Sequence, residues 1–379
     1  MNSLNFISPQ DVKDIINRKD DNYMLIDIRD EYEFNDWNIK GSVNVPINKY
    51  IASGEADEAK SALSSLNLNK KLIIICMRGT NSQLAASLLD EMRYDAYVMT
   101  KGMQGWNENF DIHEIPLKSA KNKQFTVVQF IRIGKGCLSY IVFDEYSKES
   151  AIIDPSIFIE EYINYINEHN LKPKYIIDTH AHADHFSGGK ALEKTLNVGY
   201  YVNKNDMDKG VKINNINDNS DMRLGNMQIA LHNTPGHTDG SFSLLIGDMA
   251  LFCGDLLLPE SVGRPDLARN QQETIKGAEK LYNTINSFIL KLDNEILVFP
   301  AHYTSIEKRP VTLTIEELKK YNDSLTISGK QEFIGFITSK MPKTPPNFQT
   351  IKKFNKSGTI IPLDYAEDLE IGPNRCSSR

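Results

Sequence analysis

The sequence of 379 residues is poor in cysteine and has no long apolar run. Its four cysteines, at positions 76, 137, 253 and 376, are too scattered for a disulfide scaffold, and no Cys-x-x-Cys pair is present to form a zinc ribbon. The longest apolar run, Leu72–Cys76, has the length of one strand and excludes a transmembrane helix. No signal peptide is visible at the start. These absences predict a soluble, reduced, cytoplasmic protein.

A strong excess of positive charge is also missing. The chain has 43 basic and 50 acidic residues and a net charge of -7. Nucleic acids and anionic membranes require a basic surface, so we expect neither as a partner. The hydrophobic share of 40% is ordinary for globular proteins, and the length predicts two domains with real cores. Whether the chain forms a homo-oligomer is left open.

The first part of the chain alternates short apolar runs with amphipathic ones. Tyr23–Asp27 and Lys71–Cys76 are typical of buried parallel strands. Ser82–Met92 has a helical apolar face, and Ser8 followed by Pro9 is a helix start. Alternating strands and helices predict a small parallel α/β sheet with helices on both faces over residues 1–115.

The pattern changes after this domain. Residues 116–124, which contain lysines and a proline, predict a linker. From Phe125 the apolar period becomes two, and helical segments follow, which predicts a second and larger α/β domain over residues 125–340. The tail, residues 341–379, is rich in proline, lysine and asparagine. We expect it to be loosely ordered or to wrap the surface.

The sharpest local signal is a cluster of metal-ligating residue types. His180, His182, Asp184 and His185 lie within six residues, directly after an apolar strand. Side chains in a loop just past a strand end can converge on one point. Imidazole and carboxylate groups suit zinc, iron or manganese.

The same arrangement recurs at three later strand ends, where His237, Asp255 and His302 stand. Five of the eight histidines therefore lie in these four segments. For the other three, His113, His169 and His232, we expect structural roles. A single histidine is most often structural, but a recurring cluster at strand ends indicates a metal site.

The order and spacing of these motifs resemble the metallo-β-lactamase superfamily over about residues 125–310. The resemblance implies an αβ/βα sandwich with its metal site at one edge, between the two sheets. It further implies two metal positions, bridged by Asp255. The first would be formed by His180, His182 and His237, and the second by Asp184, His185 and His302.

The superfamily includes two chemistries that share these ligands. Hydrolases such as glyoxalase II use two zinc ions to activate a water, whereas persulfide dioxygenases hold one iron with two histidines and one carboxylate. Residues 263–266, Gly-Arg-Pro-Asp, look like the Gly-Arg-Thr-Asp segment of persulfide dioxygenases, with Pro265 in place of threonine. Arg264 could bind a substrate carboxylate and Asp266 could orient it. The alternative is that the two form a structural ion pair.

Cys76 ends a buried strand and is followed by a loop and a helix start. Backbone N–H groups in such a loop would stabilise a persulfide anion. A lone cysteine at a strand end is more often inert. However, segments around Asp27, Gly41 and Gly102 resemble rhodanese signatures, and with Cys76 as the sulfur-accepting residue the match covers about residues 1–115. Asn81 stands where the family's loop commonly has arginine, and Asn38 replaces a usual histidine.

Taken together, the sequence predicts a persulfide dioxygenase fused to an N-terminal rhodanese domain. Its substrates would be a low-molecular-weight thiol persulfide and dioxygen, and its products sulfite and the thiol. One Fe(II) per chain would be held by His180, His237 and Asp255. The remaining cluster residues would surround these ligands or form a second metal site: His182, Asp184, His185 and His302. The alternatives are a dinuclear zinc thioesterase of glyoxalase II type and a sulfur-carrier or sensing module with a degenerate site. The sequence leaves open the thiol carrier and the direction of sulfur flow.

Overall fold

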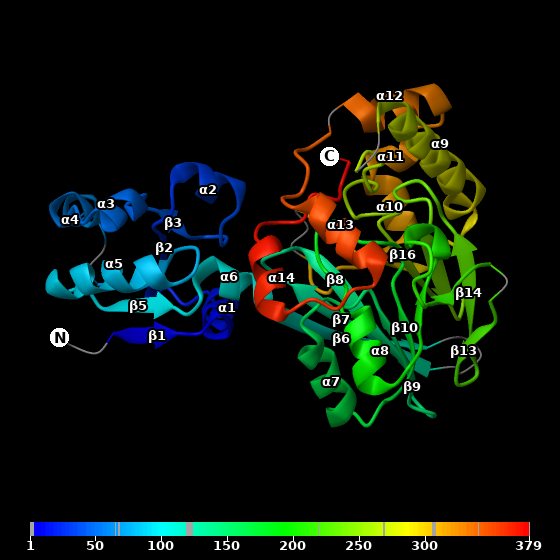
Figure 1. The fold of residues 1–379 in the computed structure, drawn as a ribbon, viewed down its shortest axis with the longest axis horizontal. Coiled ribbons are helices and arrows are strands. Elements are labelled where there is room, and N and C mark those ends of the chain that lie inside the picture. Colours follow the sequence, from blue (N-terminus) through cyan, green and yellow to red (C-terminus); the bar gives the residue numbers. More distant parts are fainter. Residues whose placement is uncertain are drawn as a thin grey trace. The chain divides into compact units, whose positions relative to one another are not determined.

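The structure, a computed structural model, describes residues 4–64, 66, 69–118, 124–218, 220–267, 270–304, 308–339 and 341–378. It divides into two units, and most of their elements are labelled in Figure 1. The first unit comprises residues 1–110 with 132–135 and 371–373, and the second comprises the rest. Within the described ranges, no helix combines the length and the apolar character needed to cross a bilayer.

The first unit is built on a five-stranded sheet in the order β1-β5-β4-β2-β3, and all its strand pairs are parallel. Its strands are β1 (Asn5–Ile7), β2 (Tyr23–Asp27), β3 (Val43–Asn44), β4 (Lys71–Ile75) and β5 (Ala96–Met99). Its helices are α1 (Pro9–Arg18), α2 (Glu31–Asp36), α3 (Asn48–Ser53), α4 (Ala56–Leu63), α5 (Thr80–Glu91) and α6 (Gly102–Glu108).

Strand β4 shows how both faces of this sheet are covered. Leu72 and Ile74 pack in one apolar cluster with Ala85 of α5. Ile73, which points the opposite way, packs in a second cluster with Val12 of α1. Successive side chains of a strand point to opposite faces, so a strand buried on both sides must be apolar throughout. The predicted parallel sheet with helices on both faces is confirmed.

The second unit contains two sheets. The first has the order β12-β11-β10-β9-β8-β7-β6 and the second the order β13-β14-β15-β16-β17-β18. The strands of the first sheet are β6 (Phe110–Lys118), β7 (Gln124–Arg132), β8 (Cys137–Asp144), β9 (Glu149–Ile153), β10 (Lys172–Ile177), β11 (Tyr200–Val202) and β12 (Asn214–Asn215). Those of the second are β13 (Met222–Leu224), β14 (Met227–Asn233), β15 (Phe242–Ile246), β16 (Ala250–Gly254), β17 (Leu297–Pro300) and β18 (Leu313–Thr314). The helices are α7 (Ile159–Glu168), α8 (Gly189–Leu196), α9 (Gln271–Ser287), α10 (Ile315–Tyr321), α11 (Asp323–Thr326), α12 (Lys330–Ser339), α13 (Phe348–Ser357) and α14 (Leu363–Leu369).

Aromatic contacts show that the two sheets face each other. Tyr140 of β8 packs edge-on against Phe252 of β16, with ring centroids 5.1 Å apart. The preceding residue, Ser139, points away and its hydroxyl lies 2.7 Å from the Tyr162 hydroxyl of α7. On the second sheet, Leu251 points away from Tyr140 and packs in the cluster that includes residues of α9. The layers therefore run helix, sheet, sheet, helix, and the αβ/βα sandwich is confirmed.

The region predicted as a linker begins inside a strand. Residues 116–118 continue β6, whose side chains alternate between more buried and more exposed positions. Proline lacks a backbone N–H and is tolerated at a sheet edge. Because β6 is the last strand of its sheet, Pro116 fits there. Of the other residues assigned to the linker, 119–123 lie outside the described part of the chain and Gln124 begins β7.

Most of the tail belongs to the second unit, with residues 371–373 in the first, contrary to the loose order expected from its composition. It forms α13 and α14, and Ile351, Ala366 and Cys376 are fully buried. Near its end, Ser377 forms an antiparallel bridge with Gly263. Ile351 is the fully buried residue of α13, and the Asn355 amide donates inward to the backbone oxygens of His182 and His185, so composition alone does not show how this helix packs.

Candidate metal centre

The residues of the predicted metal site meet at one edge of the sandwich because of strand direction. β15 is antiparallel to both β14 and β16, and β17 is parallel to β16. β14, β16 and β17 therefore run the same way, and their carboxyl ends lead to His237, Asp255 and His302. The loop after β10, residues 180–185, reaches the same edge from the other sheet. All seven predicted cluster side chains are almost fully buried.

His180, His237 and Asp255 form a group of three possible ligands whose donor atoms lie within 4.8 Å of one another. The Oδ2 atom of Asp255 lies 3.6 Å from Nε2 of His180 and 3.4 Å from Nε2 of His237. Neither Asp255 Oδ2 nor His180 Nε2 has a hydrogen-bond partner among the described residues, although both are buried. Buried polar atoms without partners are costly, so their convergence fits a metal ion.

Hydrogen bonds on the far side of both imidazoles fix the rings. His237 Nδ1–H donates to the backbone oxygen of Arg264, at 2.8 Å. His180 Nδ1 lies 2.9 Å from the hydroxyl of Thr179, which itself donates to Asp154. The Thr179 hydroxyl therefore accepts from His180. Each ring is held with its proton on Nδ1 and its Nε2 lone pair directed at the site, as metal-ligating histidines require.

The electrostatic environment favours the protonation states that a metal needs. Burial lowers the pKa of His180 well below its usual value, and the neighbouring His182 lowers it further. Burial alone would raise the pKa of Asp255, but His302 and His237 lower it well below its usual range. The site therefore offers a neutral imidazole and an ionised carboxylate. Both are the ligand forms that bind metals.

His182 lies apart from the three-ligand group, although the resemblance placed it with His180 and His237. Its Nε2 lies 3.2 Å from Asp154 Oδ1, and it forms a separate buried group with Asp154 and Asp178. Burial alone would lower the pKa of His182, but the Asp154 carboxylate outweighs this and raises the pKa to about 9. His182 is thus paired with Asp154.

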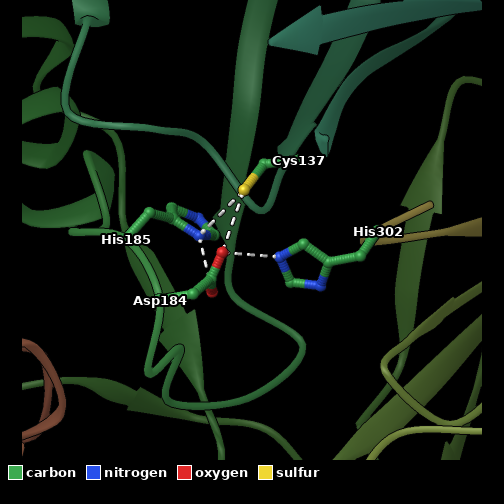
Figure 2. A group of neighbouring side chains, drawn as sticks. All are labelled: Cys137, Asp184, His185 and His302. Atoms are coloured by element: carbon green, nitrogen blue, oxygen red, sulfur yellow. Dashed lines mark hydrogen bonds and ion pairs between the residues drawn. The ribbon is translucent and has the colours of Figure 1, made fainter. Parts of the chain in front are cut away.

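A second buried cluster lies beside the first. It contains Cys137 and three residues that the sequence predicts to lie together: Asp184, His185 and His302 (Figure 2). Cys376, from the tail, forms a further group with Asp255 and His302. Burial raises the pKa of the Cys376 thiol well above its usual value. No local pattern distinguishes Cys137 or Cys376, so sequence reasoning missed both.

Arg264 has a different environment from the one expected of a residue that binds substrate. Its side chain is 1% exposed, and its guanidinium makes two hydrogen bonds with Asp266, at 2.7 and 2.8 Å. The Nη1 atom donates to the backbone oxygens of Lys343 and Arg375. These contacts match the structural alternative and fix the loop whose carbonyl orients His237. A substrate carboxylate would have to displace them.

In the first unit, Cys76 lies at the end of β4 as predicted and is nearly buried. The backbone N–H of Gly79 donates to its sulfur at 3.1 Å. A cavity of about 250 Å³ adjoins the sulfur, and Arg78 and Asn81 are among its lining residues. The Asn81 amide donates to the Asn48 side chain, at 2.6 Å. The loop therefore supplies a backbone donor and a pocket, with asparagine at the position of the family's arginine.

Comparison with known proteins agrees with this geometry. The family description "Rhodanese-like domain" matches residues 8–109, and "Metallo-beta-lactamase superfamily" matches residues 132–302. The chain is 30% identical over 214 residues to the persulfide dioxygenase ETHE1, mitochondrial, of Mus musculus, covering 55% of this chain and 80% of that protein. It is 26% identical over 208 residues to the probable polyketide biosynthesis zinc-dependent hydrolase PksB of Bacillus subtilis, covering 54% and 88%.

Among solved structures, ETHE1 from Myxococcus xanthus superimposes with a TM-score of 0.52 at 25% identity, covering 65% of this chain and 98% of that one. The names of the relatives include both an oxygenase and a zinc hydrolase.

Proposed function

Because the chain belongs to the metallo-β-lactamase superfamily, is related to the ETHE1 persulfide dioxygenases and carries a rhodanese-like domain, we propose that it oxidises a low-molecular-weight thiol persulfide with dioxygen. The products would be sulfite and the thiol, with one water supplying the third sulfite oxygen. Fe(II) would be held by His180, His237 and Asp255. The observation that carries the proposal is the convergence of two buried atoms without partners, His180 Nε2 and Asp255 Oδ2, on one point.

Two histidines and one carboxylate are typical of non-haem Fe(II) oxygenases. Iron held by His180, His237 and Asp255 would supply the redox chemistry needed to activate dioxygen towards a persulfide sulfur. The surrounding residues keep the ligands oriented. Thr179 and the backbone of Arg264 hold the two imidazoles, and His302 holds the other oxygen of the carboxylate.

The hydrogen bonds of Asp255 support one catalytic metal rather than a bridged pair. Its Oδ1 accepts from Nδ1 of His302 at 2.5 Å, and only Oδ2 faces His180 and His237. In a dinuclear site Asp255 would be shared between two metals, whereas its Oδ1 here is already engaged by His302. The hydrolase remains the second candidate because zinc-dependent hydrolases also occur among the relatives.

A large cavity beside the ligand loops supports binding of a charged thiol carrier. Its volume is about 1060 Å³, and its wall includes Ala181 and Thr238, each next to a metal-ligating histidine. Lys276, Lys352 and Asp266 also line it, so it presents charges of both signs. We propose a zwitterionic, peptide-like thiol such as glutathione as the carrier, because such a molecule has complementary amino and carboxylate groups.

Metal content and oxygen uptake test the proposal directly. Protein purified without oxygen should contain one iron per chain in the three-ligand site, consume dioxygen when a thiol persulfide is added, and release sulfite. Active protein with zinc in place of that iron, and with thioester hydrolysis but no oxygen uptake, would instead support the hydrolase. Failure to turn over any persulfide or thioester would favour a sulfur-carrier or sensing module.

We further propose that Cys76 carries sulfane sulfur in the first unit. All four cysteines are free and buried, and we propose a reducing, cytoplasmic setting for the protein. The Gly79 N–H beside the sulfur would stabilise a thiolate or persulfide anion there. A sulfur carrier suits an enzyme that consumes persulfides.

Replacing the Cys76 sulfur should separate the two activities. Cys76→Ser keeps the size of the side chain but removes the nucleophile, so sulfurtransfer from thiosulfate or a persulfide should fall to background. Oxygen uptake with added free persulfide should stay close to the wild-type rate, since the iron ligands belong to the other unit. A parallel Cys253→Ser variant, whose replaced sulfur hydrogen-bonds to backbone oxygens in the second unit, should retain sulfurtransfer. Loss of persulfide oxidation in Cys76→Ser would contradict the independence of the two centres.

A further inference from the structure

We propose that Asp206 is a positioning residue of the three-ligand metal site, because its carboxylate joins the loop that carries His180 to the loop that carries His237. This inference rests on the proposed iron site, but Asp206 is not one of the ligands. It acts through the two histidines, by keeping their loops at a fixed separation.

The Asp206 carboxylate accepts hydrogen bonds from both loops. Its Oδ2 accepts from the backbone N–H of Ala181, at 2.8 Å, and from the Thr238 hydroxyl, at 2.6 Å. Its Oδ1 accepts from the backbone N–H of Gly240, at 2.8 Å. Ala181 and Thr238 each directly follow a proposed iron ligand in the sequence. One side chain therefore fixes two ligand-bearing loops relative to each other.

Asp206 is itself held in place at the end of a short 3-10 helix, Lys204–Asp206, that follows β11. The Asn203 side chain accepts from the backbone N–H of Asn205, and the Asn203 backbone oxygen accepts from that of Asp206, both at 3.0 Å. The Asn203 amide also donates to the Asn233 side chain at the end of β14, at 3.2 Å. This turn is therefore attached to both sheets of the sandwich.

The surroundings of the carboxylate are closely packed. Asp206 is 5% exposed, and its three bonds have the lengths expected of charge-assisted hydrogen bonds. A methyl group at Gly240 would lie 2.6 Å from the Asp206 carboxyl carbon, so this backbone approaches the carboxylate more closely than a larger residue would allow. A buried carboxylate is stable only where its oxygens accept hydrogen bonds, and here both do.

The directions of the donors explain why a carboxylate is needed. The two backbone N–H groups donate to different oxygens, and a backbone N–H cannot accept a bond in return. An asparagine has one acceptor oxygen and one NH2 group. Whichever way its amide is turned, the NH2 group would face the N–H of either Ala181 or Gly240. Asp206→Asn therefore keeps the size of the side chain but releases one of the two loops.

Metal binding tests this role separately from catalysis. Metal-stripped full-length protein is titrated with iron(II) without oxygen, and the bound iron is examined as its nitric oxide complex by electron paramagnetic resonance. Loss of a residue that supports a metal ligand typically weakens metal binding about 10- to 100-fold. We expect a loss of this size in Asp206→Asn, with a changed spectrum of the iron that still binds, because the histidines are no longer held at the same separation.

Asp208→Asn is the matched control. Asp208 is exposed and lines the same cavity as Asp206, so this variant removes the same charge close by without removing the bonds to the two loops. It should bind iron with wild-type affinity and give the wild-type spectrum. An equal loss of iron in both variants would show that charge alone matters, and would overturn the inference.

Thr238 provides a second pair of variants, which decides the point even if Asp206→Asn does not fold. Thr238→Val removes the hydroxyl that donates to Asp206 and keeps the shape of the side chain. One bond of three is lost, so iron affinity should fall about tenfold, the lower end of the usual range. Thr238→Ser retains the hydroxyl and should restore wild-type affinity and spectrum.

The outcomes separate a positioning role from a purely structural one. A lower melting temperature of Asp206→Asn with unchanged iron affinity and spectrum would overturn the inference, as would equal iron binding in Thr238→Val and Thr238→Ser. Wild-type protein that binds iron but oxidises no persulfide would contradict the proposed function and leave the role of Asp206 intact. Wild-type protein that binds no iron would overturn both.

Discussion

The His237→Ala variant should lose both its iron and its oxygen uptake. His237 supplies one of only three protein ligands in the proposed iron site, and the methyl group of alanine offers no donor atom. Removing it also leaves the Asp255 carboxylate facing a buried void. We expect iron in the purified protein to fall to background and persulfide oxidation with it, measured by elemental analysis and with an oxygen electrode.

A histidine outside the cluster provides the control. His113 pairs with Asp111 at a partly exposed position of β6, where an ion pair is worth at most about 1 kcal/mol. His113→Ala should therefore keep wild-type iron content and activity. If His237→Ala retained iron and oxygen uptake, the assignment of the three ligands would be wrong.

The second large effect is expected from Gly263→Ala. A methyl group at this position would overlap the backbone oxygen of Asp255 and lie 3.0 Å from His237 Nδ1. The loop carrying Gly263 would have to move away from both ligands. That would break the bond between His237 and the Arg264 carbonyl. We expect loss of iron and a melting temperature lowered by several degrees, because overpacking typically costs about 1–3 kcal/mol.

The matched control is another glycine of the same unit. Gly335 lies exposed in α12, and a methyl group there would meet nothing within 4 Å. Gly335→Ala should keep full iron content and raise stability, since alanine is favoured over glycine in a helix by about 0.8–1.0 kcal/mol. A Gly263→Ala variant with normal iron content would show that the loop does not set the position of the ligands.

The site residues that could be predicted from the sequence are those that follow the carboxyl ends of strands. His180, His237, Asp255 and His302 each follow an apolar strand, and carboxyl ends of co-directional strands meet at one edge. Local patterns are therefore sufficient to identify these residues. The sequence also predicts that His180, His237 and Asp255 belong together, but the pairing of His182 with Asp154 could not be predicted, because it joins side chains from separate segments.

The site residues that could not be predicted from the sequence lie in segments far apart in the chain. Cys137 begins a strand instead of following one, and Cys376 lies in a tail whose composition resembles a disordered segment. The structural contacts of Arg264 could not be predicted either, because its guanidinium donates to two backbone oxygens of the distant tail. Composition also misassigned Pro116, whose tolerance in β6 depends on that strand being at the sheet edge.

The bridge between Ser377 and Gly263 has a consequence for how the protein is made. Arg264 and Arg375, whose carbonyl it binds, are separated by 111 positions in the chain. A nascent polypeptide synthesised as far as β17 already carries His180, His237 and Asp255, but the loop behind His237 still lacks its contacts with Arg375 and Ser377. The proposed iron site can therefore be completed only after these tail residues have been added, more than a hundred positions after the loop they hold in place.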